Sequence, residues 1–192
     1  EYKATLSKPP AKTDLGVQYE VKYDLPGIKA ETTVHFEILA DGTLKVRMSF
    51  VPKQENLPNI PRLGMYLQLP RNYQTISWYG KGPLESYADR KTGQKTGMYS
   101  GNVMDEFERY SRPQETGNKS DLRWVQVRSD QLKLTAQRKK GFLNSSFWPF
   151  LMKELDFNHD DAGVSASGLV PVTKRHGADI NIGDLFQWNI DL

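Results

Sequence analysis

The segment SWYGKGPLESYADR places two carboxylates, Glu85 and Asp89, four positions apart. Two carboxylates at ~5–9.5 Å can act as the acid and base of glycoside hydrolysis, and a spacing of four lets both face one side of a helical turn. Arg90 and Lys91 follow directly, however, and a neighbouring cation lowers the pKa of a carboxylate. A lowered pKa suits an ion pair better than a general acid. We therefore expect these two residues to be structural rather than catalytic.

A second group of carboxylates, in DFNHDDAG, has part of the pattern of a calcium-binding loop. Asp156, Asn158 and Asp160 match the odd positions that supply oxygen ligands in such a loop. The sixth position holds Asp161 instead of glycine, and the twelfth holds Ser167 instead of glutamate. The pattern therefore predicts a polar turn, and we expect no metal site in this chain.

The histidines do not have the spacing of a zinc-binding pair. His35, His159 and His176 are separated along the sequence, and the chain contains no cysteine. A cysteine-based zinc site, a thiolate nucleophile and a disulfide framework are therefore excluded. His176, in the segment KRHGAD, is either a ligand-facing side chain or an ordinary surface histidine.

The composition favours a globular protein with a β-rich core. Of 192 residues, 38% are hydrophobic and 26% charged, and four are Trp. Indole rings either stack on sugars or fill a core while donating their N–H to a carbonyl. Charges of both signs are interspersed, with a net charge of +3, so we expect no nucleic-acid partner. No apolar run approaches the ~20 residues of a membrane span, so we expect no membrane partner. The sequence does not distinguish a cytoplasmic from a periplasmic location.

Alternation of apolar and polar residues predicts many short strands. The alternation is clear over residues 15–25 and over residues 31–52, where the sequence ADG predicts the turn of a hairpin. Residues 81–100 show no clear period. Further strands are predicted at residues 62–70, 75–80, 121–129, 131–137, 142–150 and 184–192. No window has a sustained helical period, so the sequence predicts an all-β antiparallel sandwich, as a single domain over residues 1–192.

Four ordered segments resemble the C-terminal domain of β-galactosidases of glycoside hydrolase family 2. They are PRLGMYLQLP, ISWYGKGPLESYADRKTG, SRPQETGNKSDLRW and KRHGADI…WNID. They match the family's R-x-G, W-x-G-x-G-P-x-E-x-Y-x-D-R, P-Q-E-x-G, R-W, H and N-I-D in that order, over residues 17–192. The resemblance implies a large antiparallel β supersandwich, similar to the galactose-mutarotase fold. Both ends of the chain look cut, so we expect a truncated piece of a longer multidomain enzyme.

The resemblance also assigns roles to the motif residues, which would brace a loop against its neighbours instead of reacting. They are Arg62, Trp78, Gly80, Gly82, Pro83, Glu85, Tyr87, Asp89, Arg90, Arg123 and Trp124. Gly80 and Gly82 are expected to supply backbone angles that a side chain would forbid.

In that family the loop ending in N-I-D places an aromatic residue over the sugar. The equivalent position here is Gln187, and Trp188 is shifted by one residue. Adjacent residues of a strand face opposite sides, so the shift matters. We carry Trp188, Gln187 and His176 as candidate substrate-binding residues.

The resemblance implies a non-catalytic domain of a retaining β-galactosidase, an enzyme that hydrolyses terminal non-reducing β-D-galactosides. Catalysis would belong to a separate TIM barrel, and any Mg²⁺ and Na⁺ sites to the other domains, so this chain is expected to hold no cofactor and to be inactive alone. Its partners would be the barrel, the other domains and, through the parent site, the galactoside. The alternative is a free-standing carbohydrate-binding or aldose-mutarotase-like module, with His176 and either Glu154 or Asp156 as acid and base.

Overall fold

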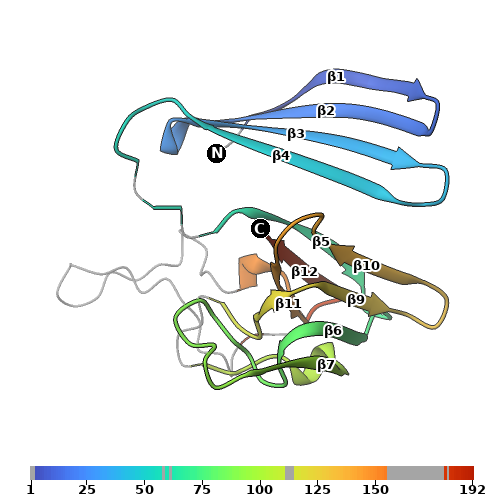
Figure 1. Cartoon of the computed structure of the whole chain (residues 1–192), viewed down its shortest axis with the longest axis vertical. Helices are drawn as coiled ribbons and strands as arrows, with labels where there is room; N and C mark the ends of the chain where they lie inside the picture. Colours follow the sequence, from blue (N-terminus) through green and yellow to red (C-terminus); the bar gives the residue numbers. More distant parts are fainter. Residues whose placement is uncertain (1–2, 58, 61, 111–114, 155–179, 181) are drawn as a thin grey trace. The chain divides into compact units, whose positions relative to one another are not determined.

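The computed structural model describes residues 3–57, 59–60, 62–110, 115–154, 180 and 182–192. The chain divides into two compact units, Glu1–Pro61 and Arg62–Leu192, called here the sheet unit and the sandwich unit. Every named strand pair is antiparallel, and the helices of the described residues are three-residue 3₁₀ turns (Figure 1). The predicted all-β antiparallel class is confirmed. The assignment of residues 1–192 to a single domain stays a prediction.

The sheet unit is one four-stranded sheet in the order β1-β2-β3-β4. Its elements are β1 (Lys3–Thr13), β2 (Gly16–Leu25), η1 (Pro26–Ile28), β3 (Ala30–Leu39) and β4 (Leu44–Pro52). The hairpin predicted from ADG joins β3 to β4. Gly42 has a φ of +85°, which glycine adopts without steric cost, and Asp41 accepts a hydrogen bond from the Thr43 N–H at 2.8 Å.

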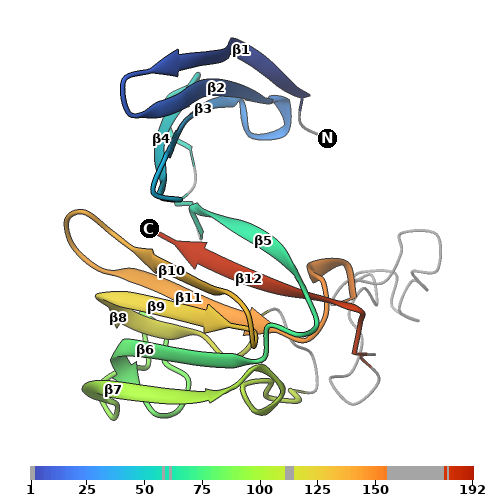
Figure 2. The same cartoon turned by 90° about the vertical axis from the view of Figure 1, so that its right-hand side faces the viewer.

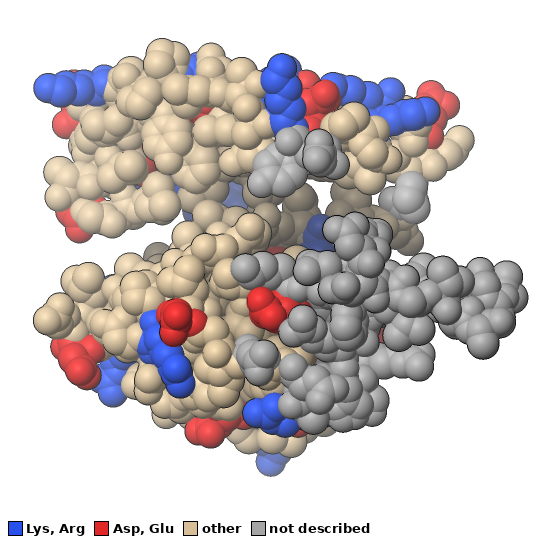
Figure 3. Space-filling model, turned by 180° about the vertical axis from the view of Figure 1, so that it is seen from behind, with Lys and Arg blue, Asp and Glu red and all other residues tan. Residues whose placement is uncertain are grey.

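Alternation gives this sheet one apolar and one charged face. On the apolar face, Tyr19 stacks on its cross-strand neighbour Phe36 with ring centroids 4.8 Å apart. On the charged face, lysines lie beside carboxylates on neighbouring strands, and Figure 3 shows blue basic and red acidic side chains interspersed along the top of the view. The ion pairs include Lys8–Glu20, Lys22–Glu31, Lys45–Glu37 and Lys53–Asp24.

The sandwich unit contains two four-stranded sheets, in the orders β10-β9-β6-β7 and β5-β12-β11-β8 (Figure 2). Its strands are β5 (Gly64–Pro70), β6 (Thr75–Gly82), β7 (Lys95–Asn102), β8 (Lys119–Leu122), β9 (Trp124–Arg128), β10 (Lys133–Gln137), β11 (Leu143–Trp148) and β12 (Leu185–Asp191). Two turns, η2 (Val103–Asp105) and η3 (Met152–Glu154), complete the described elements.

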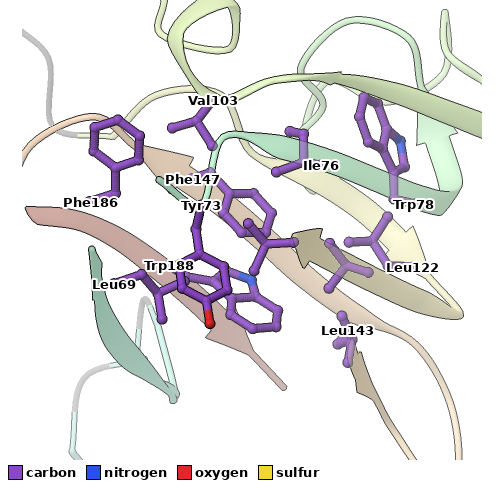
Figure 4. Close-up of a cluster of buried hydrophobic side chains, with 12 residues drawn as sticks. Leu69, Tyr73, Ile76, Trp78, Val103, Leu122, Leu143, Phe147, Phe186 and Trp188 are labelled. Carbon is purple, nitrogen blue, oxygen red and sulfur yellow. The ribbon is translucent and has the colours of Figure 1, made fainter. Parts of the chain in front are cut away.

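Buried side chains from both sheets form one core in this unit (Figure 4). Trp188 stacks on Phe147 with ring centroids 5.2 Å apart, and Trp78 and Leu122 belong to the same cluster. A smaller cluster contains Phe107, Trp148, Phe150 and Ile180. Burial of each large apolar side chain stabilises the fold by about 1.5–3 kcal/mol, so the sandwich unit has a core of its own.

No helix among the described residues has the length and apolar character needed to cross a membrane.

Candidate functional site

The motif segment predicted to brace a loop begins at the end of β6. There, side chains of neighbouring strands lie very close to Gly80 and Gly82. A Cβ added at Gly80 would lie 2.4 Å from Leu122 Cδ2, and one at Gly82 would lie 2.6 Å from Tyr99 Cδ2. Neither glycine has a positive φ. The expectation that these glycines supply unusual backbone angles is therefore wrong. The reason for glycine is space, because neighbouring chain occupies the position of a side chain.

Glu85, in the loop that follows the cis Gly82–Pro83 peptide, is an anchor for three segments. Its Oε1 accepts hydrogen bonds from the Arg90 guanidinium at 2.5 Å and from the Tyr110 hydroxyl. Its Oε2 accepts from the Tyr87 hydroxyl at 3.2 Å and from the Gly117 N–H at 2.9 Å. The side chain is only 8% exposed. One carboxylate thus ties the 83–90 loop to two later parts of the chain.

The electrostatics of this anchor favour the ionised carboxylate. Burial alone would raise the pKa of Glu85, but hydrogen bonds from Tyr110, Gly117 and Arg90 outweigh burial and hold the pKa below its ordinary value. The pKa of Tyr87 is raised by burial and by the adjacent Glu85 charge, so its hydroxyl stays a donor. The arrangement can hold a loop, but it is poorly suited to releasing a proton. Asp89, the predicted neighbour of Glu85, is exposed.

Ser86 attaches the same loop to β8 with buried hydrogen bonds. Its N–H donates to the Asn118 carbonyl at 2.7 Å, and its Oγ accepts from the Ser120 N–H at 3.0 Å. Its carbonyl accepts from the Asn118 side-chain amide at 2.7 Å. Glu85 and Ser86 are therefore both hydrogen-bonded to the segment Gly117–Ser120.

Arg62 links the start of β5 to the end of β12. Its Nε and Nη2 donate to the two carboxylate oxygens of Asp191 at 2.8 and 2.7 Å, and Nη1 lies 3.5 Å from a Glu115 oxygen. The guanidinium also lies over the Trp148 ring, 5.8 Å from its centroid. Burial raises the pKa of Glu115, and the Arg62 charge only partly offsets it. This site is therefore a structural tie between the two chain segments.

Lys119 is a buried cation held by a carboxylate and an indole. Its Nζ lies 2.5 Å from Glu106 Oε2 and 5.1 Å from the Trp78 ring centroid, and 6% of its side chain is exposed. The Trp78 indole N–H donates to the Lys81 carbonyl at 3.0 Å. Beside this pair lies a cavity of about 210 Å³, lined by Trp78, Pro83, Leu84, Glu85, Ser100, Asp105, Glu106, Glu108 and Lys119.

The R-W motif residues also lie in the framework. The Arg123 guanidinium lies between two rings, 4.6 Å from the Tyr79 centroid and 4.9 Å from that of Phe142. Trp124 begins β9 and pairs across the sheet with Tyr79. Together they join β6 and β9 to the chain entering β11.

The candidate sugar-contacting residues of β12 lie on opposite faces of their strand. Trp188 points into the core, is 2% exposed, and donates its indole N–H to Ser145 Oγ at 2.9 Å. Gln187 is buried on the other face, where its Oε1 accepts the Met152 N–H at 2.9 Å. Its Nε2 donates to Asn189 Oδ1 at 2.7 Å. In this chain both side chains are engaged by protein, and their contact with a sugar stays a prediction.

Two further candidates, His176 and Asp156, lie outside the described residues, as does the calcium-like segment around Asp160. Within the described residues, no group of three or more His, Asp or Glu side chains is arranged to hold a metal ion.

Sequence reasoning identified the motif residues but missed their partners. Tyr110 and Gly117 lie 25 and 32 residues beyond Glu85, and no spacing rule connects them to it. Glu115 and Gly117 do belong to the quoted segment SRPQETGNKSDLRW. The ordered occurrence of that segment after the Glu85 motif was the one signal that could have suggested the contact.

A model of the β-galactosidase small chain matches residues 3–177. The chain belongs to the β-galactosidase small-chain family. The match extends over the sheet unit and most of the sandwich unit, so both belong to the part of the sequence that defines this family.

Relatives of this small-chain sequence are bacterial and yeast proteins named β-galactosidase. The Priestia megaterium protein is 39% identical over 111 residues, which are 58% of this chain and 11% of that protein. The Lactobacillus delbrueckii subsp. bulgaricus protein is 35% identical over 141 residues, 73% of this chain and 14% of that protein. The Kluyveromyces lactis protein is 31% identical over 123 residues, 62% of this chain and 11% of that protein. The matched region thus spans about a tenth of the length of these relatives.

Proposed function

We propose that the chain is a non-catalytic scaffold domain of a β-galactosidase, which packs on the catalytic part of that enzyme and helps to shape its sugar pocket. The observation that carries this proposal is the saturation of Glu85. Four groups donate hydrogen bonds to the two carboxylate oxygens of Glu85, and the pKa of Glu85 is lowered. A general acid for glycoside cleavage needs a raised pKa and access to the leaving oxygen.

The relatives support the rest of the proposal. They are named β-galactosidase, and this chain matches about a tenth of their length. The remainder of such a protein would supply the two catalytic carboxylates, any Mg²⁺ and Na⁺ sites, and the surface on which this domain packs. The 185–191 segment would approach the galactoside from the side of the leaving group.

A chimeric enzyme tests the proposal. The matched region of the Lactobacillus delbrueckii β-galactosidase is replaced by this chain, and hydrolysis of an aryl β-galactoside is measured for the chimera and for the 192-residue chain alone. We expect turnover by the chimera and none by the isolated chain. Turnover by the isolated chain that is lost in Glu85→Gln would overturn the proposal. A folded chimera without activity would count against it as well.

Two binding assays separate the scaffold from a free-standing sugar module. The isolated chain is titrated with galactose and with lactose in a calorimeter, and the interconversion of galactose anomers is followed by polarimetry. We expect no saturable heat at millimolar sugar and no acceleration of mutarotation. Either signal would replace the scaffold role with a carbohydrate-binding or mutarotase role.

A further inference from the structure

One cavity is lined entirely by residues of the sandwich unit, and the scaffold function proposed above does not use it. Its volume is about 210 Å³, and its wall is formed by the end of β6 and the loop after it, by β7, by the segment that begins at η2, and by β8. This volume lies below the ~300–1,000 Å³ of pockets for drug-sized ligands. A ligand for this cavity must therefore be small, of about the size of one sugar ring.

Lys119 brings hydrogen-bond donors to the wall of this cavity. Its side chain is 6% exposed, and its Nζ lies 2.5 Å from Glu106 Oε2 and 5.1 Å from the Trp78 ring centroid. An ammonium group has three N–H donors. Among the residues that the structure describes, one carboxylate, that of Glu106, pairs with Nζ. Because a buried donor without an acceptor is costly, an oxygen atom of a ligand in the cavity would stabilise the ammonium group.

The negative charges on the wall outnumber the cations that balance them. Of the four carboxylates that line the cavity, Glu85 and Glu106 each have a cationic partner. The other two, Asp105 and Glu108, are exposed and form no ion pair with any described residue. Since Lys119 is buried, the unbalanced negative charge lies nearer to solvent than the ammonium does. A ligand with a positive group at the mouth of the cavity is therefore attracted, and an anion is repelled.

The arrangement of these carboxylates favours an organic cation over a metal ion. No three acidic side chains of the described segments are placed so that they could hold a metal ion together. A protonated amine needs no such convergence, because each of its N–H groups can donate to a different carboxylate.

The wall of the cavity is already fixed by contacts within the protein. On one side, the hydrogen bonds of Glu85 hold the loop after β6. On the other side, Asn102 Oδ1 accepts the Met104 N–H at 3.0 Å, and the Glu108 N–H donates to Thr116 Oγ1 at 2.8 Å. Because these contacts exist without a ligand, little ordering of the chain is needed on binding.

We propose that this cavity binds an amino sugar, or a similar polyhydroxylated amine, in its protonated form. A ring hydroxyl accepts a hydrogen bond from Lys119, and the ammonium group of the ligand donates to Asp105 and Glu108 at the mouth. Pro83 and Leu84 provide apolar surface for the carbon skeleton. Neutral sugars such as galactose and lactose lack the cation and are not the expected ligands, so this inference does not depend on the scaffold function.

Three ring compounds of similar size test the chemistry of the ligand. The 192-residue chain is titrated in a calorimeter with glucosamine, glucose and cyclohexylamine at about pH 6, where both amines are protonated. We expect saturable binding of glucosamine. Glucose lacks the ammonium group and cyclohexylammonium lacks the hydroxyls, so each should bind at least ~10-fold more weakly. Absence of saturable glucosamine binding, or equal affinity for either control compound, would overturn the proposal.

Substitutions at the mouth locate the site. Asp105→Asn combined with Glu108→Gln removes two exposed charges and leaves the buried pair intact, so the variant should fold and bind glucosamine at least ~10-fold more weakly. Asp89→Asn is the matched control, because Asp89 is an exposed carboxylate that does not line the cavity, and it should bind like the natural chain. An unchanged affinity in the double variant, or an equal loss in Asp89→Asn, would show that the ligand is not held in this cavity.

A second double variant tests the role of Lys119 as the hydroxyl donor. Lys119→Met combined with Glu106→Gln removes both buried charges, so neither is left without its partner. Circular dichroism checks that the variant is folded. Glucosamine should then lose its advantage over cyclohexylammonium. A folded variant that still binds glucosamine at least ~10-fold more tightly would contradict the assignment of Lys119.

Discussion

The sheet unit and the sandwich unit are built from similar strands, but they bury their side chains very differently. Among the described residues of the sheet unit, only Ala30, Thr32 and Val34 are buried. In the sandwich unit, residues from both sheets form a core of twelve buried side chains. The same period-two pattern thus produces a sheet held by cross-strand neighbours in one unit and a packed core in the other.

The two units also place their charges in different environments. Lys8 and Lys53 in the sheet unit are 68% and 47% exposed in their ion pairs, whereas Lys119 and Glu85 in the sandwich unit are 6% and 8% exposed. Exposed pairs contribute about 0–1 kcal/mol. Removing one partner of a buried pair costs about 3–5 kcal/mol, because the other charge stays buried. Polar residues therefore matter more to stability in the sandwich unit.

The largest expected difference between the units comes from their aromatic pairs. Trp188→Ala removes a core side chain stacked on Phe147 and should lower the free energy of unfolding by about 3–5 kcal/mol. Tyr19→Ala removes one ring of the partly exposed stack with Phe36 and should cost only about 1 kcal/mol. Urea unfolding followed by circular dichroism measures both. Equal losses would mean that the sheet unit has a core as well packed as that of the sandwich unit.

Two carboxylates of the sandwich unit should respond oppositely to neutralisation. Glu85→Gln removes a charge that four donors stabilise and should cost about 2–4 kcal/mol at pH 7. Glu115→Gln is the matched control. Burial raises the Glu115 pKa, so its ionised form disfavours folding, and the variant should be as stable as the natural chain or slightly more stable.

The pH dependence of these variants checks the sign of each effect. The folded-state pKa of Glu85 lies below the ordinary value of 4.5, so its contribution to stability is present above pH 4.5 and is lost as the pH falls through the folded-state pKa. The folded-state pKa of Glu115 lies above 4.5, so its cost is present at neutral pH and disappears below pH 4.5. A Glu85→Gln deficit that persisted undiminished in strong acid would contradict this assignment.

A smaller loss of stability is expected from a substitution at Gly80, and Gly93 provides the matched control. Gly80→Ala places a Cβ 2.9 Å from Leu122 Cα and should cost about 1–3 kcal/mol, since strand backbone must move. A Cβ at Gly93 would meet no atom within 4 Å, so Gly93→Ala should change stability by about 0.5 kcal/mol or less. Thermal unfolding of both variants makes the comparison. A neutral Gly80→Ala would show that β6 and β8 are loosely packed.

The smallest effect should come from the charged face of the sheet unit. Lys45 is 53% exposed in its 3.2 Å pair with Glu37. Lys45→Ala should therefore change the free energy of unfolding by about 0.5 kcal/mol, and 1 M salt should remove the difference. A larger loss that salt leaves unchanged would point to packing of the lysine stem instead of its charge.

Much of the strand content could be predicted because alternation marks a sheet with one buried face. It identified β2, the β3–β4 hairpin, β5, β6 and most later strands. β1 was missed because the sequence KPPAK lacks apolar alternation, and this strand is exposed along almost its whole length. β7 was missed because its glycines and exposed Met98 interrupt the pattern, although β6 aligns it through a continuous register.

The candidate site shows where local reasoning stops. Neighbouring cations correctly indicated that Glu85 would be an ion-pair residue, and Arg90 is a partner five positions away. The contacts with Tyr110 and Gly117 depend on how distant segments meet after folding, and the Arg62–Asp191 pair joins residues 129 positions apart. The close approach of Leu122 to Gly80 is likewise a tertiary fact that no single-residue preference contains.

All four tryptophans lie beyond Arg62, so the sandwich unit contains every indole of the chain. Tryptophan fluorescence excited at the red edge of indole absorption will therefore report the unfolding of that unit alone. The sheet unit will give no tryptophan signal. A single sigmoidal emission curve would therefore describe the unfolding of only one of the two units. A tryptophan introduced at Phe36 would give the sheet unit a signal of its own.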